Sequence, residues 1–325
     1  MANAYEVVME SRKQLVDKMI RLMEQGVVFT KPLWEQGAIL PYNPFTNVRY
    51  RGGNRFRLLD AVTENGYQDP RWGTFLQYQK KGYSIRKGEK GILCEKWIFE
   101  KEIREKNPEG KMELKKVPLE RPMVSYFVVF NGEQVKDFPS YRPRELPPTE
   151  LQDLTERLKS VSECPVVECA QTRAYYSLTE DRITLPLPGM FKDDASYLKT
   201  LLHEMGHSTG HPDRLNRDLG QPFGSEAYAR EELRAEIGSL FLGQELGVKL
   251  DAEHYQDHSN YLSSWLSVLK KDYQEFFRAC ADAEKIADRI TEQYEREYFP
   301  RNLIPEEEIP EHPRQRKKLV KVPGR

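Results

Sequence analysis

The sequence predicts an α+β protein built from two domains. Segments with the period of strands and segments with the period of helices both occur along the chain. A proline-rich stretch near the middle, 139–150, disfavours helix and sheet pairing. The charge also divides there, because residues 1–140 hold 24 Lys and Arg against 18 Asp and Glu, whereas residues 150–300 hold 17 against 28. We therefore place one domain at 1–140, a linker at 141–150 and a second domain at 151–300.

The first domain is predicted to mix helices and strands. Apolar residues at helical spacing predict an amphipathic helix over 5–26. Residues 40–60 are rich in Tyr, Asn, Pro, Gly and Arg, which indicates turns followed by a short helix from about Arg55. Runs of apolar and aromatic residues predict strands at 92–99 and 124–130.

Two charged segments lack a clear apolar face. Residues 100–116 lie between the two predicted strands and carry a turn signal at 107–110, which indicates a solvated hairpin tip or a flexible loop. Residues 301–325 are rich in proline and charge. Such a composition buries too little apolar surface to fold, so we predict a disordered tail.

The second domain is predicted to be mostly helical with a small antiparallel sheet. Thr149 is a suitable N-cap for a helix over 149–162. Alternating apolar side chains on one side of an Asp-Arg turn predict a strand pair over 174–187. Further helical stretches follow from apolar residues at helical spacing. They are 194–210, 226–246 and 258–297, the last containing one or two helices.

Composition excludes several classes of protein. The first residues are charged where a signal peptide needs an apolar core, and no apolar run is long enough to span a bilayer. The four cysteines form no C-x-x-C pair, so neither a zinc ribbon nor a redox motif is indicated. We expect a cytoplasmic protein with reduced thiols and no membrane partner.

The strongest chemical motif is His203-Glu204-Met205-Gly206-His207, an H-E-x-x-H sequence within a predicted helix. At this spacing the two imidazoles lie one turn apart on the same face, so both can bind one metal ion. We predict one Zn²⁺, which binds imidazole nitrogen readily. Glu204 lies beside the ligands and is predicted to be the catalytic base that takes a proton from water.

A catalytic zinc ion usually takes three protein ligands. We assign the third to Glu232, because the small residues on its helix face allow close packing against the H-E-x-x-H helix. Glu236, one turn further on, is expected to accept the second ring N–H of a ligating histidine. Glu231 is expected to be an ordinary surface carboxylate. The alternative third ligand is Asp213, because H-E-x-x-H-x-x-G-x-x-D resembles a metzincin arrangement.

In a peptidase site the substrate lies along an edge strand above the metal. Residues 182–187 are predicted to form that strand, since the prolines at 186 and 188 suit an edge. A tyrosine hydroxyl could stabilise an oxyanion in such a site. Tyr175, Tyr176 and Tyr261 are all candidates, and the sequence does not select among them.

Basic and aromatic residues alternate through the first domain, with ten Lys and Arg against four Asp and Glu over 49–90. Single-stranded nucleic acids are bound by positive charges along the phosphates and by aromatic rings stacked on bases. The same aromatics could instead form the core of the domain. The predicted contacts with single-stranded DNA are Arg49, Tyr50, Arg51, Asn54, Arg55, Arg71, Trp72, Phe75, Tyr83, Lys87 and Lys90, with Phe56 as a further stacking candidate.

Taken in order, the motifs of this chain resemble those of the ArdC-type antirestriction proteins, whose N-terminal domain also occurs in primases of conjugative plasmids. The similarity runs from about Trp34 to residue 290. The motifs are NPFTNVRYRGGN, RWGTFLQYQKKG with RKGEKG, DRITLP, LLHEMGHSTGHPDRLNR, EELRAEIGSLFL and YLSSWLSVLKKD.

The resemblance implies a single-stranded-DNA-binding domain fused to a zincin-like metallopeptidase domain. It further implies that His203 and His207 bind metal, that Glu204 is catalytic and that EELRAE supplies an acidic ligand. Ser208 departs from the family, which often has Trp there, and we interpret this as a change in the pocket. The implied role is protection of incoming plasmid DNA from host restriction during conjugation.

Three functions compete for these motifs. The first is a DNA-recruited zinc metallopeptidase with an unknown protein substrate. The second is a non-catalytic protective protein that binds single-stranded DNA and whose metal site is structural or vestigial. The third is a nuclease, which the acidic second half disfavours because it would repel DNA.

Overall fold

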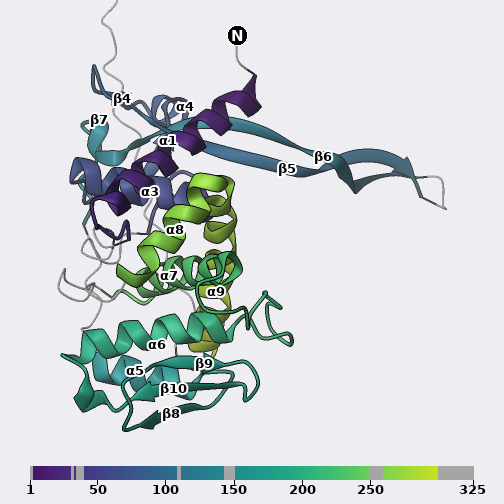
Figure 1. Cartoon of the computed structure of the whole chain (residues 1–325). Coiled ribbons are helices and arrows are strands. Elements are labelled where there is room, and N and C mark those ends of the chain that lie inside the picture. Colours follow the sequence, from purple (N-terminus) through teal and green to yellow (C-terminus); the bar gives the residue numbers. More distant parts are fainter. Residues whose placement is uncertain are drawn as a thin grey trace, which may run out of the picture.

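The computed structural model describes residues 3–30, 33, 40–107, 111–142, 151–248 and 259–298. It has the predicted α+β composition, with helices and several small sheets (Figure 1). All but two residues of the predicted linker and the whole of the predicted tail lie outside the described residues.

In the N-terminal half, helix α1 begins at a capping box formed by Asn3 and Glu6 and ends just before Gly26, which confirms the first predicted helix. Helix α3 begins at Gly52, earlier than predicted. Gly52 has φ of 55°, a left-handed conformation that lets the chain turn into the helix. The helices are α1 (Ala4–Glu24), α3 (Gly52–Asn65) and α4 (Phe75–Lys80), with the short 3₁₀ helix η1 (Gly132–Gln134).

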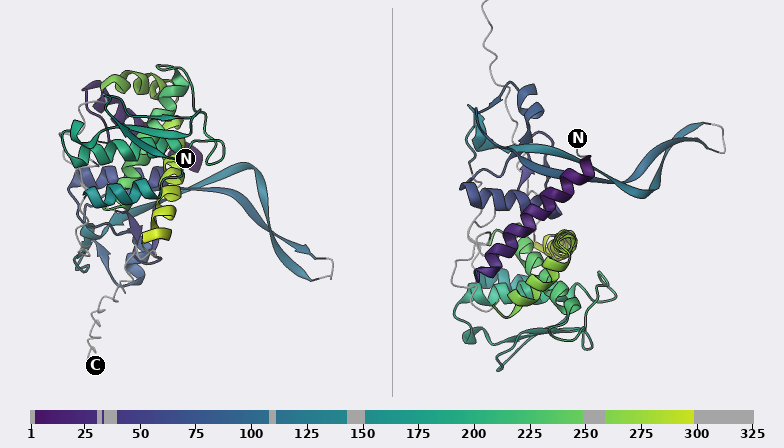
Figure 2. Two further views of the ribbon diagram at one scale, coloured as in Figure 1. Left: turned by 90° about the horizontal axis from the view of Figure 1, so that it is seen from below. Right: turned by 45° about the horizontal axis from the view of Figure 1, so that its top comes forward.

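The strands of this half form three small sheets. The largest has the order β3-β6-β5, so β6 is central and β5 is an edge. Strands β5 and β6 continue through the charged segment that separates the predicted strands, and together they form a long two-stranded arm (Figures 1 and 2). This confirms a hairpin at 100–116 and excludes a loop for its described part. The strands are β1 (Tyr42–Asn43), β2 (Val48–Arg49), β3 (Trp72–Thr74), β4 (Ser84–Ile85), β5 (Ile92–Lys106), β6 (Met112–Asn131) and β7 (Val135–Lys136).

The C-terminal half is mostly helical and has one three-stranded sheet of order β8-β10-β9. Strand β10 pairs in parallel with β8 and antiparallel with β9, so the sheet is mixed. The prediction that 182–187 form an edge strand is therefore wrong, because β10 at 182–186 is the central strand and β9 is an edge. The elements are α5 (Leu151–Ser160), β8 (Val166–Cys169), β9 (Tyr175–Ser177), β10 (Arg182–Pro186), η2 (Pro188–Met190), α6 (Asp194–Ser208), α7 (Glu226–Glu245), α8 (Ser259–Lys271) and α9 (Gln274–Tyr298).

One hydrophobic core extends through both halves. Helix α9 packs against α7 of its own half and against α3 of the N-terminal half. At this junction the ring of Phe56 lies 4.8 Å from that of Phe276, and Phe29 lies 5.7 Å from both. Burial of these large rings is strongly stabilising. The two halves recognised in the sequence therefore share a core that includes the helices carrying the H-E-x-x-H motif and Glu232.

Among the described residues, no helix is long and apolar enough to cross a membrane. The four cysteines are free thiols, and Cys94, Cys164 and Cys280 are buried. Burial raises the pKa of Cys94 to about 12, so this thiol is protonated at neutral pH.

Candidate metal centre

Helices α6 and α7 pack closely and bring the predicted ligands together. Asp193 is the N-cap of helix α6, and its side chain accepts a hydrogen bond from the backbone N–H of Ser196. Gly206 faces Ala235 of α7, and a methyl group added at Gly206 would lie 3.6 Å from the Ala235 Cα, in ordinary van der Waals contact. The absence of large side chains at this contact allows the carboxylate of Glu232 to reach the histidines of α6.

The donor atoms of His203, His207 and Glu232 converge on one point. The two Nε2 atoms lie 3.1 Å apart. The carboxylate oxygens of Glu232 lie 3.3 Å from His203 Nε2 and 3.4 Å from His207 Nε2. Within the described part of the chain, these three residues form the one group of side chains suited to hold a metal ion.

These residues fit a divalent ion. Ligands bound tetrahedrally to zinc at about 2.0–2.1 Å lie roughly 3.3–3.4 Å apart, close to the observed separations. Electron-pair donors at such distances repel one another unless a proton or a metal ion lies between them. Burial alone would raise the pKa of Glu232, but the adjacent His207 and His203 rings hold that pKa well below its usual range. The site therefore favours an ionised carboxylate and a positive charge at its centre.

His207 is also held on its other ring nitrogen. Its Nδ1 atom lies 3.2 Å from Glu231 Oε1, and Arg217 donates hydrogen bonds of 2.7 and 3.0 Å to the two Glu231 oxygens. Glu231 is buried, so its assignment as a surface carboxylate was wrong. The guanidinium of Arg217 compensates the negative charge of Glu231, which allows this carboxylate to be buried.

Glu236 does not take the role predicted for it beside a ligating histidine. It is fully buried and accepts a 2.6 Å hydrogen bond from Thr30 of the N-terminal half. The carboxylate beside His207 Nδ1 is Glu231, on the helix face that meets α6. Asp213 lies outside the ligand group, exposed and 3.6 Å from His211 Nδ1, which removes the metzincin-like alternative.

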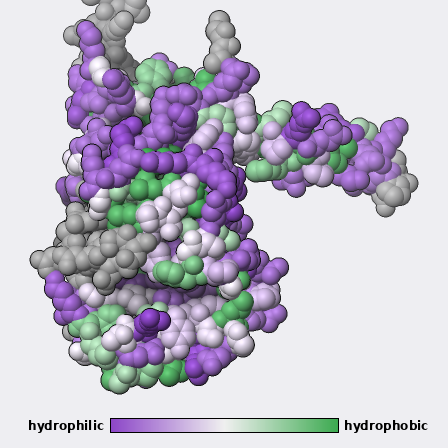
Figure 3. Space-filling model, in the orientation of Figure 1, coloured by the Kyte–Doolittle hydropathy of each residue, from purple (hydrophilic) through white to green (hydrophobic). Residues whose placement is uncertain are grey.

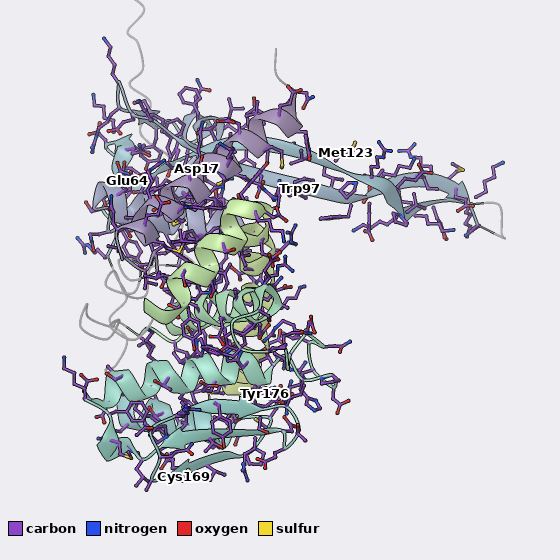
Figure 4. All side chains as sticks on the ribbon, viewed as in Figure 1. Asp17, Glu64, Trp97, Met123, Cys169 and Tyr176 are labelled. Carbon is purple, nitrogen blue, oxygen red and sulfur yellow. The ribbon has the colours of Figure 1, made fainter. Side chains whose placement is uncertain are left out.

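Glu204 lies in α6 between the two ligands and is buried. Burial raises its pKa, while the histidines and the backbone N–H of Tyr176 act in the opposite direction. Tyr176 belongs to β9, on the side of the sheet that faces α6 (Figure 4). The carboxylate is thus held next to the ligands by the edge strand of the sheet.

These groups line a cavity of about 370 Å³. Tyr175, Tyr176 and Tyr261, the three candidates from the sequence, all line it, and so does Tyr228. The hydroxyl of Tyr228 lies 3.4 Å from that of Tyr261. Sequence reasoning missed Tyr228, although its position one turn before Glu232 on α7 indicates the same helix face. The remaining lining residues include the segment from Asp218 to Gln221.

The predicted DNA contacts divide into a buried and an exposed group. Arg71 forms a buried ion pair with Asp69 at 2.7 Å, and Trp72, Tyr83 and Phe56 are core residues. Such side chains offer no accessible face to a base or phosphate in this conformation. Tyr50 donates a hydrogen bond to the Trp72 carbonyl.

Other predicted contacts bind the C-terminal half or a neighbouring strand. Arg49 and Arg55 pair with Glu245 at 2.6 and 3.1 Å, and Arg51 pairs with Asp288 of α9. Asn54 exchanges two hydrogen bonds with the backbone of Glu95 in β5. The predicted contacts left exposed and without such structural pairs are Phe75, Lys87 and Lys90.

Comparison with known proteins agrees with this arrangement. Residues 9–130 match the N-terminal domain of the anti-restriction factor ArdC, and residues 155–282 match a zincin-like metallopeptidase domain. The metal-free crystal structure of the antirestriction protein ArdC from plasmid R388 is 31% identical, covers 89% of this chain and 99% of its own, and has a TM-score of 0.68. The chain belongs to the ArdC family.

The Mn(II)-bound structure of R388 ArdC is 29% identical to our ArdC-family protein, with a TM-score of 0.68 over 87% of this chain and 97% of its own. A DNA primase TraC of Escherichia coli is 39% identical over 85% of this chain, which spans only 19% of that primase. An uncharacterized protein, y4eC, of Sinorhizobium fredii is 31% identical over 85% of this chain and 90% of its own. The family thus comprises free-standing proteins as well as longer primases that contain a similar region.

Proposed function

We propose that this ArdC-family protein is a zinc-dependent peptidase of the cytoplasm that is recruited to single-stranded DNA and protects incoming plasmid DNA from restriction. The observation that carries the proposal is the convergence of His203, His207 and Glu232 beside the buried Glu204. Two imidazole nitrogens and one carboxylate are a donor set typical of catalytic zinc. The Mn(II)-bound structure of R388 ArdC, a relative of this chain, supports a divalent metal ion in this family.

The residues around the cavity can perform the parts of peptide hydrolysis. A bound divalent ion supplies Lewis acidity, which polarises a carbonyl group and lowers the pKa of water. Glu204 is placed to accept a proton and to deliver it to the leaving amine, because a carboxylate with a raised pKa can do both. Tyr228 and Tyr261 line the cavity with hydroxyl groups 3.4 Å apart, and such groups can donate to a developing oxyanion.

Strand β9 is suited to bind an extended peptide. One edge of β9 pairs with β10, and β9 lies next to α6, with Tyr175 and Tyr176 in the cavity lining. A peptide that adds to the outer edge of β9 would gain main-chain hydrogen bonds and would lie beside Glu204. The substrate class is therefore an extended or locally unfolded protein segment.

The Glu204→Gln variant tests catalysis. Glu204 is not among the ligands, so the variant is expected to bind zinc and single-stranded DNA normally and to lose protection of transferred DNA. Glu232→Ala, which removes a ligand, is expected to lose both zinc and protection. Full protection by a zinc-loaded Glu204→Gln protein would reject the peptidase and favour a non-catalytic protective protein with a structural metal site.

We assign DNA binding to the exposed surface that contains Phe75, Lys87 and Lys90, since stacking and phosphate contact need accessible side chains. The double variant Lys87→Glu/Lys90→Glu is expected to weaken binding of a fluorescent oligonucleotide at low salt and to flatten its salt dependence. Lys13→Glu/Arg21→Glu makes the same charge change at exposed positions of α1 and serves as the control. Equal weakening by both pairs, or a preference for duplex, would contradict this assignment.

A further inference from the structure

The distal part of the β5–β6 arm is an unusual surface for an isolated chain. Residues 100–106 of β5 and 112–118 of β6 pair only with each other, and the arm extends away from the body in every view (Figures 1 and 2). Apolar side chains lie among the charges on the arm (Figure 3). Met112 and Leu114 are 58% and 66% exposed. An isolated two-stranded ribbon is at best marginally stable in water, so a partner would stabilise it.

The two long edges of the arm differ in their capacity to pair. Strand β6 contains Pro118 and Pro122, which lack the N–H groups that a new neighbouring strand requires. Strand β5 contains no proline and is the edge strand of its sheet. Residues 100–106 are exposed except for the half-buried Ile103. The outer edge of β5 is therefore the edge at which a further strand can add.

The sequence of this edge is complementary to itself. Residues 100–106 read Glu-Lys-Glu-Ile-Arg-Glu-Lys. In an antiparallel pair of two copies with the two-fold axis at Ile103, each Glu102 lies opposite an Arg104. In the same register Lys101 lies opposite Glu105, and Glu100 lies opposite Lys106. Every charged residue of the segment then faces the opposite charge, and Ile103 faces Ile103.

No neighbouring register shares this property. Directly opposed residues of an antiparallel pair point to the same face of the sheet, so the two-fold axis must lie at a residue and not between two residues. The nearest alternative registers therefore have the axis at Glu102 or at Arg104. Centring on Glu102 places the two copies of Glu102 opposite each other, and centring on Arg104 does the same with Arg104. Within the described part of the chain, the charges of 100–106 make one ion pair, between Glu105 and Lys115 at 3.1 Å. Most of these charges thus remain available for a partner strand.

We propose that the outer edge of β5 is a dimerisation surface, at which the arms of two copies of this chain pair antiparallel about Ile103 to form a four-stranded sheet. The interface is isologous, as expected for a two-fold dimer. Charged edge strands ordinarily discourage pairing, but here the charges favour one partner strand, an identical one. Each dimer would carry two metal centres on bodies that lie far apart at the ends of the joined arms.

Charge exchange tests the proposal in the full-length protein. Sedimentation velocity at low salt is expected to show a dimer whose population falls as salt screens the ion pairs. Glu102→Arg and Arg104→Glu each place like charges opposite one another and are expected to raise the dissociation constant on the order of tenfold. The double variant, and an equimolar mixture of the two single variants, restore opposite charges and are expected to restore dimers.

Cross-linking tests the register independently. Ile103→Cys is expected to form an intermolecular disulfide on mild oxidation, because the two introduced thiols would lie directly opposite each other. Arg104→Cys lies opposite Glu102 and is the matched control, with the parent protein as background for its native thiols. The proposal would be overturned if the parent protein were monomeric or if the single variants dimerised normally. It would equally be overturned if the double variant and the mixture failed to dimerise, or if cross-linking were equal at 103 and 104.

Discussion

At the scale of single residues, the metal centre depends on a side chain that does not touch the metal position. Glu231 contacts His207 Nδ1 and is itself held by two hydrogen bonds from Arg217. Arg217 also donates to the Gly206 carbonyl and the Thr209 hydroxyl, so it fixes the end of α6 to α7. These contacts restrict the rotation of the His207 ring and keep its Nε2 atom directed at Glu232.

We expect Glu231→Ala to weaken metal binding by about 10–100-fold, because partners that orient a ligating histidine contribute that much. Glu231→Gln keeps one acceptor for the ring N–H and is expected to lose less. Chelator competition with Zn²⁺ measures both affinities. Glu226→Ala on the same helix is the control, since Glu226 is exposed and pairs with Lys271. Unchanged affinity in Glu231→Ala would show that the ring does not need this carboxylate.

The buried ion pair of Asp69 and Arg71 leads to a second expectation. Arg71→Met leaves an uncompensated buried carboxylate and is expected to destabilise the protein by about 3–5 kcal/mol. Lys87→Met at an exposed position is expected to change stability by less than about 0.5 kcal/mol and to weaken DNA binding instead. Urea unfolding and oligonucleotide binding separate the two effects. Equal stability of both variants would place Arg71 outside the core.

The side chains whose proximity follows most directly from the sequence are those with a fixed local spacing. His203 and His207 share a helix face because they are four residues apart, and no tertiary knowledge is needed. Glu231 was mispredicted because consecutive residues on a helix point about 100° apart, and periodicity assigns them to different faces. In the folded chain α6 lies across both positions, so Glu232 faces the ligand group and Glu231 faces the side of His207.

At the scale of elements, the space beside a helical glycine differs from one helix contact to another. A methyl group at Gly53 of α3 would lie 2.5 Å from the ring of Phe277 in α9, which is a severe overlap. At Gly206 of α6 the nearest atom would be the Ala235 Cα at 3.6 Å, an ordinary contact. A glycine-to-alanine substitution therefore causes a steric overlap at Gly53 and none at Gly206.

Gly53→Ala is expected to destabilise the protein by about 1–3 kcal/mol, because the overlap exceeds the roughly 1 kcal/mol gained in helix propensity. Gly206→Ala gains propensity without overlap and is expected to be neutral or stabilising by up to about 1 kcal/mol. Thermal unfolding of the metal-free proteins measures both changes. A Gly53→Ala protein as stable as its parent would mean that α3 and α9 are packed more loosely than observed.

The positions of the elements along the chain were easier to predict than the way in which they pair in space. Apolar periodicity located α6 and α7 to within two residues, since each buries a face along its whole length. The position of β10 in its sheet was missed because the proline at 186 was taken as a mark of an edge strand. Pro186 is the last residue of β10, where the loss of one N–H affects only the end of the ladder. Which strand becomes the edge depends on long-range pairing with β8 and β9.

At the scale of the whole molecule, some of the opposite charges of the two halves form ion pairs with each other. Arg49, Arg51 and Arg55 pair with carboxylates of α7 and α9 across the junction. Composition predicted the asymmetry, but it cannot distinguish attraction to DNA from attraction to the other half. The proline-rich boundary indicated two domains, and two domain models match the chain on either side of it. The buried side chains of both domains form a continuous core.

This shared core predicts that metal binding stabilises the half that does not hold the metal. A ligand that binds only the folded state stabilises it by about 2.7 kcal/mol when its free concentration is a hundred times the dissociation constant. Because Phe56 of α3 packs on Phe276 of α9, loss of either half exposes the core of the other. We therefore expect Zn²⁺ to slow hydrogen exchange of the slowest amides in α3 as well as in α7. We also expect it to raise the midpoint temperature of a single unfolding transition. Glu232→Ala removes both effects while leaving the core unchanged. Protection gained in α7 alone, with a separate and unshifted transition for α3, would mean that the halves unfold independently despite the rings packed between them.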